Sequence, residues 1–127
     1  MTLNGFRAYC LAKKGVEADF PFDDNTLTMR VMKKMFALTN VAETNILGER
    51  VPSFYSINLK FDLEEVEKTR EKYEAVIPGY HMNKKYWNSV IIDGSISDRQ
   101  IKEWIDKSYD LIVDSLPKKV KLELQEL

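Results

Sequence analysis

The chain has 127 residues, of which 44% are hydrophobic and 31% charged, and its 19 basic and 20 acidic residues give a formal net charge of −1. This length matches a single domain with one hydrophobic core. The near-neutral balance argues against tight nonspecific DNA binding, which relies on an excess of positive charge, although a local basic patch would still suffice. No run approaches the ~18 consecutive apolar residues of a membrane span.

The sequence has one cysteine, Cys10, which excludes an intramolecular disulfide. Its place on the apolar side of a predicted helix indicates a buried hydrophobe rather than a reactive thiol. The N-terminus lacks the basic-then-apolar layout of a secretion signal. We therefore expect one domain over residues 1–127, cytoplasmic and monomeric, that needs no cofactor.

Hydrophobic periodicity and turn residues predict the elements in chain order. They are a helix over residues 2–14, strands over 27–31, 35–39 and 55–61, a helix over 62–73, a strand over 86–92, a helix over 97–116 and a short C-terminal helix. Residues 40–52 are predicted to form a loop. Hairpin-linked strands with one polar face predict an α+β fold, in which helices pack on one face of an antiparallel sheet.

Two helix starts carry a capping-box pattern. Asp62 precedes Glu65 by three residues, and Ser97 likewise precedes Gln100. The second pattern opens the longest helix, whose apolar stripe has helical spacing over four turns and includes Ile101, Trp104, Ile105, Ser108, Ile112 and Leu116. We expect this stripe to face the core.

Charge is distributed unevenly along the chain. Residues 25–60 hold five basic and two acidic side chains, a balance of +3, and residues 77–92 add Lys84 and Lys85 without an acid, +2. Residues 62–76 and 93–117 each hold three basic and six acidic side chains, −3. One interpretation is that these are solvated helix faces and turns. The other is a basic patch over the strands and turns, able to meet a phosphate backbone.

The segment from Tyr80 to Gly94 concentrates side chains that could bind a ligand. It holds His81, Asn83, Lys84, Lys85, Tyr86 and Trp87 ahead of a polar Asn-Ser pair and a buried strand. Aromatic rings beside cations can stack on bases while contacting phosphate. Alternatively, Trp87 anchors the fold, Asn83 and Ser89 cap the turn, the lysines are solvated, and His81 is a loop histidine bonded to backbone.

Catalytic patterns are weak in this sequence. With one histidine and one cysteine, neither a structural zinc site nor a Ser-His-Asp arrangement is expected, and the glycines form no phosphate loop. We therefore expect a protein that is not an enzyme.

The same segment resembles the MmcQ/YjbR family of small bacterial proteins. The matching pattern consists of His81, Asn83, Lys84, Trp87, Ser89, Val90, Asp93-Gly94, Asp98 and Ser108-Tyr109, together with the opening Tyr9 to Glu17 and with Leu116-Pro117. The resemblance covers nearly the whole chain. Tyr86 departs from it, because the family usually has a second histidine at this position.

The resemblance implies a compact fold similar to the frataxin-like (CyaY-like) arrangement, sometimes described as a double wing. Family members are commonly labelled DNA-binding, a label that rests on likeness of fold.

Two functional hypotheses are compatible with these patterns, and neither involves a membrane. The first is a weak DNA-binding module with Lys33, Lys34, Lys60, Lys84 and Lys85 on phosphates and Tyr86 or Trp87 stacking on bases. The alternative is a site for a small anionic ligand or a peptide, built from His81, Asn83, Lys84 and Trp87.

Overall fold

The computed structural model describes residues 1–41, 55–79 and 82–127. Their helices are α1 (Leu3–Leu11), α2 (Val66–Lys72), α3 (Asp98–Ser115) and α4 (Lys118–Gln125). Their strands are β1 (Val16–Asp19), β2 (Thr26–Val31), β3 (Lys34–Asn40), β4 (Tyr55–Lys60), β5 (Val76–Pro78) and β6 (Trp87–Ile92). His81 and most of the loop predicted over residues 40–52 lie outside the described residues.

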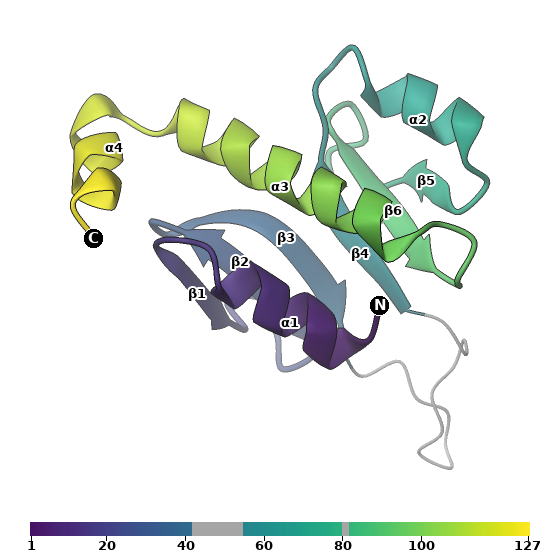
Figure 1. The fold of residues 1–127 in the computed structure, drawn as a ribbon, viewed down its shortest axis with the longest axis horizontal. Coiled ribbons are helices and arrows are strands. Elements are labelled where there is room, and N and C mark those ends of the chain that lie inside the picture. The colour runs from purple at the N-terminus through teal and green to yellow at the C-terminus, as the bar shows by residue number, and fades with distance from the viewer. Residues whose placement is uncertain (42–54, 80–81) are drawn as a thin grey trace.

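The described strands form one antiparallel sheet in the order β1-β2-β3-β4-β6-β5. Figure 1 shows α1 and α3 lying across the same face of this sheet, with α2 beside β5 and β6 and α4 at the far end of α3. The predicted α+β class, with helices packed against an antiparallel sheet, is therefore confirmed. We call the sheet face opposite α1 and α3 the open face.

Two strands were not predicted from the sequence, and both lie at sheet edges. β1 has four residues and β5 has three, so neither is long enough to show a clear alternation. β1 pairs with β2 from Val16 to Asp19, and β5 pairs with β6 through Val76, Ile77 and Pro78. Pro78 is compatible with its strand because an edge strand leaves one row of N–H groups unpaired.

One of the two predicted capping boxes is wrong. The backbone carbonyl of Asp62 accepts hydrogen bonds from the N–H groups of Glu65 and Val66, at 2.9 and 3.0 Å. Residues 62–65 therefore form a turn, and α2 begins only at Val66, without a side-chain cap. The box at α3 has its capping bond, because Ser97 Oγ accepts from the N–H of Gln100 at 3.1 Å.

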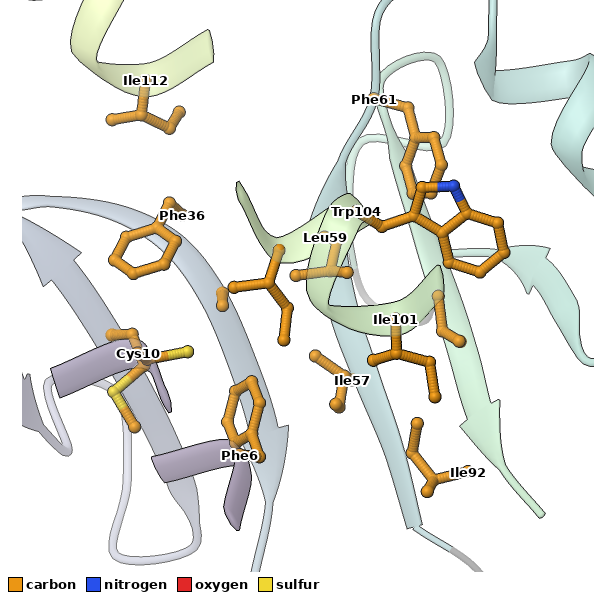
Figure 2. Packing of buried hydrophobic residues seen from close by; sticks show 14 of the residues in the cluster. Phe6, Cys10, Phe36, Ile57, Leu59, Phe61, Ile92, Ile101, Trp104 and Ile112 are labelled. Carbon is orange, nitrogen blue, oxygen red and sulfur yellow. The ribbon is translucent and has the colours of Figure 1, made fainter. Parts of the chain in front are cut away.

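The core lies between the sheet and the helices. Figure 2 shows Phe6 and Cys10 of α1 on one side of it and Trp104 of α3 beside Phe61 on the other, where the ring centroids are 5.7 Å apart. The predicted α3 stripe is buried along its whole length, from Ile101 to Leu116. On β4, Tyr55, Ile57 and Leu59 are buried toward the helices, while Ser56, Asn58 and Lys60 point to the open face and are half-buried.

Ser108 of α3 is the polar member of this stripe and is fully buried. Its hydroxyl donates to the carbonyl of Phe36 on β3 at 2.6 Å and accepts from the N–H of Lys60 on β4 at 2.9 Å. The β3–β4 register ends at Ala37 and Leu59, next to these two residues on each strand. The serine hydroxyl thus replaces the next bond of the ladder and fixes the helix to both strands.

Substitution of Ser108 by alanine should destabilise the fold by about 1–3 kcal/mol, because it leaves a buried carbonyl and a buried N–H without a partner. Urea unfolding measures this change. Ser115→Ala is the matched control on the same helix, since Ser115 is exposed and bonds only the Ile112 carbonyl nearby. Equal unfolding free energies for the two variants would contradict the bridging role.

Candidate functional site

The turn that precedes β6 is organised by Asn83. Its carbonyl accepts from the N–H groups of Tyr86 and Trp87, at 3.2 and 3.0 Å, and its Oδ1 accepts from the N–H of Lys85 at 3.0 Å. Asparagine favours such a turn because its side chain can bond the backbone two residues on. The turn exposes Lys84 and Lys85 together. The alternative in which Asn83 caps the turn is thus seen in the structure, whereas Ser89, the other expected cap, donates its hydroxyl to Asn58 Oδ1 on β4.

Two ammonium groups share the ring of Tyr86. Lys60 Nζ and Lys85 Nζ each lie 5.5 Å from its centroid, within the range of a cation–π contact. Lys60 comes from the end of β4, where it pairs with Trp87 across the strands. We call Lys60, Lys84, Lys85 and Tyr86 the lysine cluster.

Lys84 is joined to the end of β5. Its Nζ donates to the carbonyl of Gly79 at 3.3 Å, and the N–H of Gly79 donates to the carbonyl of Trp87 at 2.9 Å. A Cβ at position 79 would lie 2.9 Å from that carbonyl oxygen, so only glycine permits the approach. This contact holds the turn against β6.

Arg70 of α2 supports the turn from the helix side. Its guanidinium donates to Asn88 Oδ1 at 2.6 Å, to the carbonyl of Trp87 at 3.2 Å and to the carbonyl of Lys84. Asn88 is fully buried, and its Nδ2 donates to the carbonyl of Val66 at 3.1 Å. A buried amide with both ends bonded therefore connects α2, β6 and the lysine cluster.

A cavity of about 800 Å³ lies on the open face beside this cluster. Its wall includes Asn83 from the turn, Trp87 from the start of β6, Ser56 and Asn58 from β4, Leu38 from β3, and Phe22. The side chain of Trp87 is only 7% exposed, so it forms part of this wall and offers no free outer surface for stacking. Tyr86 is half-buried and is the aromatic side chain that the turn itself presents.

The structure groups only some of the predicted site residues. Lys60 and Lys85 meet at the Tyr86 ring, and Lys84 lies in the same turn with its Nζ on the Gly79 carbonyl. Asn83 and Trp87, which flank this stretch of the chain, line the cavity. Lys33 and Lys34 are exposed at the β2–β3 turn, where Lys33 lines a different cavity with Gly15, Val16 and Val120. His81 lies outside the described residues.

The helix side of the lysine cluster is acidic. A groove of about 420 Å³ between α2 and α3 is lined by Lys60 and Lys107 but also by Asp62, Glu65, Asp110 and Asp114. The four carboxylates outnumber the two ammonium groups here, so the charge of this groove disfavours an anion.

Two side chains that could act as nucleophiles have raised pKa values. Burial raises the pKa of the Cys10 thiol to about 12, so the thiolate is disfavoured at neutral pH. The pKa of Tyr9 is also raised to about 12, by its hydrogen bond to Asp106 and by burial. Within residues 1–41, 55–79 and 82–127, no three His, Cys, Asp or Glu side chains are grouped to hold a metal ion.

No helix in these ranges is long and apolar enough to cross a membrane.

Comparison with known proteins decides the family. The YjbR family model matches residues 11–111. The chain belongs to the YjbR family. Uncharacterized protein YjbR of Escherichia coli K12 is 31% identical over 127 residues, which is 100% of both chains. Uncharacterized protein YbdF of Escherichia coli O157:H7 is 35% identical over 104 residues, 82% of this chain and 78% of its own.

Solved structures of the same fold agree with this assignment. The crystal structure of Deinococcus radiodurans protein DR2400, with domain DUF419, has a TM-score of 0.84 at 31% identity and covers 98% of this chain and 88% of its own. A crystal structure from Pseudomonas syringae has a TM-score of 0.71 at 27% identity, covering 87% of this YjbR-family chain and 98% of its own. These relatives fix family and fold, whereas activity has to be argued from the site.

Several residues of the site were not among the sequence candidates. Arg70 lies within an acidic helix, where the sequence gives no reason to expect a contact with the turn. The alternation of β4 assigns Ser56 and Asn58 to the polar side of a strand, but it does not show that they line a cavity. The clearest available signal was Asn88, an amide directly before a run of buried strand residues. Its position requires hydrogen-bond partners, and Arg70 supplies one of them.

Replacement of Arg70 by methionine should loosen the turn, because the carbonyls of Lys84 and Trp87 and the buried Asn88 Oδ1 all lose a donor. Hydrogen exchange of the Tyr86 and Trp87 amides should accelerate roughly tenfold or more, as about 1–3 kcal/mol of hydrogen bonding is lost. Arg99→Met, at an exposed position on α3, is the control. Unchanged protection in Arg70→Met would show that Asn83 alone holds the turn.

Proposed function

We propose that this YjbR-family chain is a noncatalytic module that binds single-stranded DNA weakly, with the lysine cluster on the phosphate backbone. The observation that carries the proposal is the convergence of Lys60 and Lys85 on the Tyr86 ring, with Lys84 in the same turn. Two cations on one ring, with a third lysine in the same turn, concentrate positive charge that a phosphate can use, and the aromatic ring beside them can stack on a base.

The distribution of charge favours a single strand over a duplex. A helix that enters the major groove needs a basic face, whereas the segments containing α2 and α3 each hold six acidic and three basic residues. The lysine cluster instead lies next to the open-face cavity, and a hollow of this kind suits unpaired bases. The acidic groove between α2 and α3 disfavours a strand on the helix side.

A fluorescence-anisotropy titration with a labelled single-stranded oligonucleotide tests the proposal. Affinity should fall steeply between about 50 and about 200 mM salt, and loss of one phosphate contact should lower the slope of log affinity against log salt by about 0.7. We expect that change for Lys60→Met and for Lys85→Met. Lys119→Met, at an exposed position on α4, should leave the slope unchanged.

Undetectable binding of the wild-type chain at about 50 mM salt, where phosphate contacts are strongest, would refute the proposal. Equal slopes for Lys60→Met and Lys119→Met would place the strand elsewhere, and the β2–β3 turn with Lys33 and Lys34 would then be the next surface to examine.

A small anionic ligand or a peptide is the second candidate, because the lysine cluster would also attract an isolated anionic group. Inorganic pyrophosphate is the discriminating probe. Pyrophosphate and the oligonucleotide are compared at the same total concentration of phosphate groups. If pyrophosphate displaces the oligonucleotide under this condition, the cluster recognises the anion alone and the rest of the strand adds nothing to binding.

A further inference from the structure

We infer that the open-face cavity binds the heterocyclic ring of a nucleoside, either as a free molecule or as an unpaired base of a strand. The strand form rests on the proposed function, whereas the free form stands without it. The shared chemistry is a flat, neutral ring with hydrogen-bonding groups around its edge.

The size and the walls of the cavity suit such a ring. About 800 Å³ is within the range of small-molecule sites, which combine apolar walls with a few polar groups. Trp87 and Leu38 are buried residues of the sheet that contribute apolar atoms to the cavity wall. Phe22 lies at the opposite extreme, 65% exposed although it lines the same cavity, so it is free to cover a bound ring.

Polar groups without a partner in the described chain point to the same ligand. Asn58 Oδ1 accepts from Ser89 Oγ, which leaves Asn58 Nδ2 as an unused donor. Asn83 Oδ1 is likewise bonded, by the Lys85 N–H, and its Nδ2 is unused. Ser56 Oγ lies on the same cavity wall, two residues before Asn58 on β4, and it can donate or accept. Amide and hydroxyl groups of this kind pair with the edges of bases.

The charge of the lining argues against an anion inside the cavity. Among the described lining residues the charged side chain is Asp23. Asp23 is exposed and ionised at neutral pH, and hydrogen bonds from the N–H of Asn25 and from the Thr26 side chain lower its pKa further. The described lining therefore offers an anion no cation, and its one carboxylate favours a neutral ring over a carboxylate or phosphate.

The lysine cluster lies where the phosphate of a nucleotide would be needed. Trp87 lines the cavity, and its cross-strand neighbour in the pairing of β6 with β4 is Lys60. Directly paired residues have their Cβ atoms about 4.5–5.5 Å apart on the same sheet face. When a base occupies the cavity, the sugar and phosphate attached to it are thus brought toward Lys60, Lys84 and Lys85.

Equilibrium binding of four uncharged nucleosides to the full chain, measured by ¹⁵N NMR shifts, tests the inference. At least one nucleoside should bind, and Asn58→Asp should weaken it about tenfold, because it exchanges the free amide donor for an acceptor while keeping the oxygen that Ser89 bonds. Ser56→Ile is a second variant, which fills the cavity with a residue that favours strands. Asn4→Asp, at an exposed position on α1, is the matched control.

The oligonucleotide titration, carried out with the same variants, distinguishes a free nucleoside from an unpaired base of a strand as the ligand. If nucleosides bind but the oligonucleotide does not, the inference holds and the proposed function fails. If the oligonucleotide binds with the Lys60-dependent salt slope, no nucleoside binds, and Asn58→Asp and Ser56→Ile leave its affinity unchanged, the inference is overturned and the proposed function holds.

Discussion

The hydroxyl of Ser108 is the constraint on which the position of the candidate site depends. It lies between β3 and β4 at the point where their register ends, and it bonds a carbonyl of one strand and an N–H of the other. The N–H belongs to Lys60, whose ammonium group contacts Tyr86. A buried helix residue thereby fixes the backbone of a residue that carries positive charge at the surface.

A second polar contact completes the support. Asn88 reaches α2 on one side through Val66 and Arg70, and Arg70 in turn holds the carbonyls of Lys84 and Trp87. Buried polar groups that are fully bonded specify one arrangement, because any other would leave donors or acceptors unpaired. The core and the lysine cluster are thus parts of the same structure, and the open-face cavity lies at their border.

The long elements of the fold could be predicted from the sequence, whereas the short strands and the grouping of the site residues could not. Long periodic segments such as α3 and β4 were found because each buries one face along its whole length. β1 and β5 were missed because three or four residues carry too little pattern, and the start of α2 was misplaced because a backbone carbonyl replaced the expected cap. The convergence of Lys60 with Lys85, and the separation of Lys33 and Lys34 from them, depends on strand order, which local sequence does not encode.

The most direct test of the central claim is a map of backbone amide shifts in ¹⁵N NMR spectra when a short single-stranded oligonucleotide is added at about 50 mM salt, where phosphate contacts are strongest. We predict that the largest shifts lie at residues 56–60 and 83–88, on the two sides of the lysine cluster and the cavity. Shifts confined to α3, α4 or the β2–β3 turn, or no shifts at all, would contradict the account.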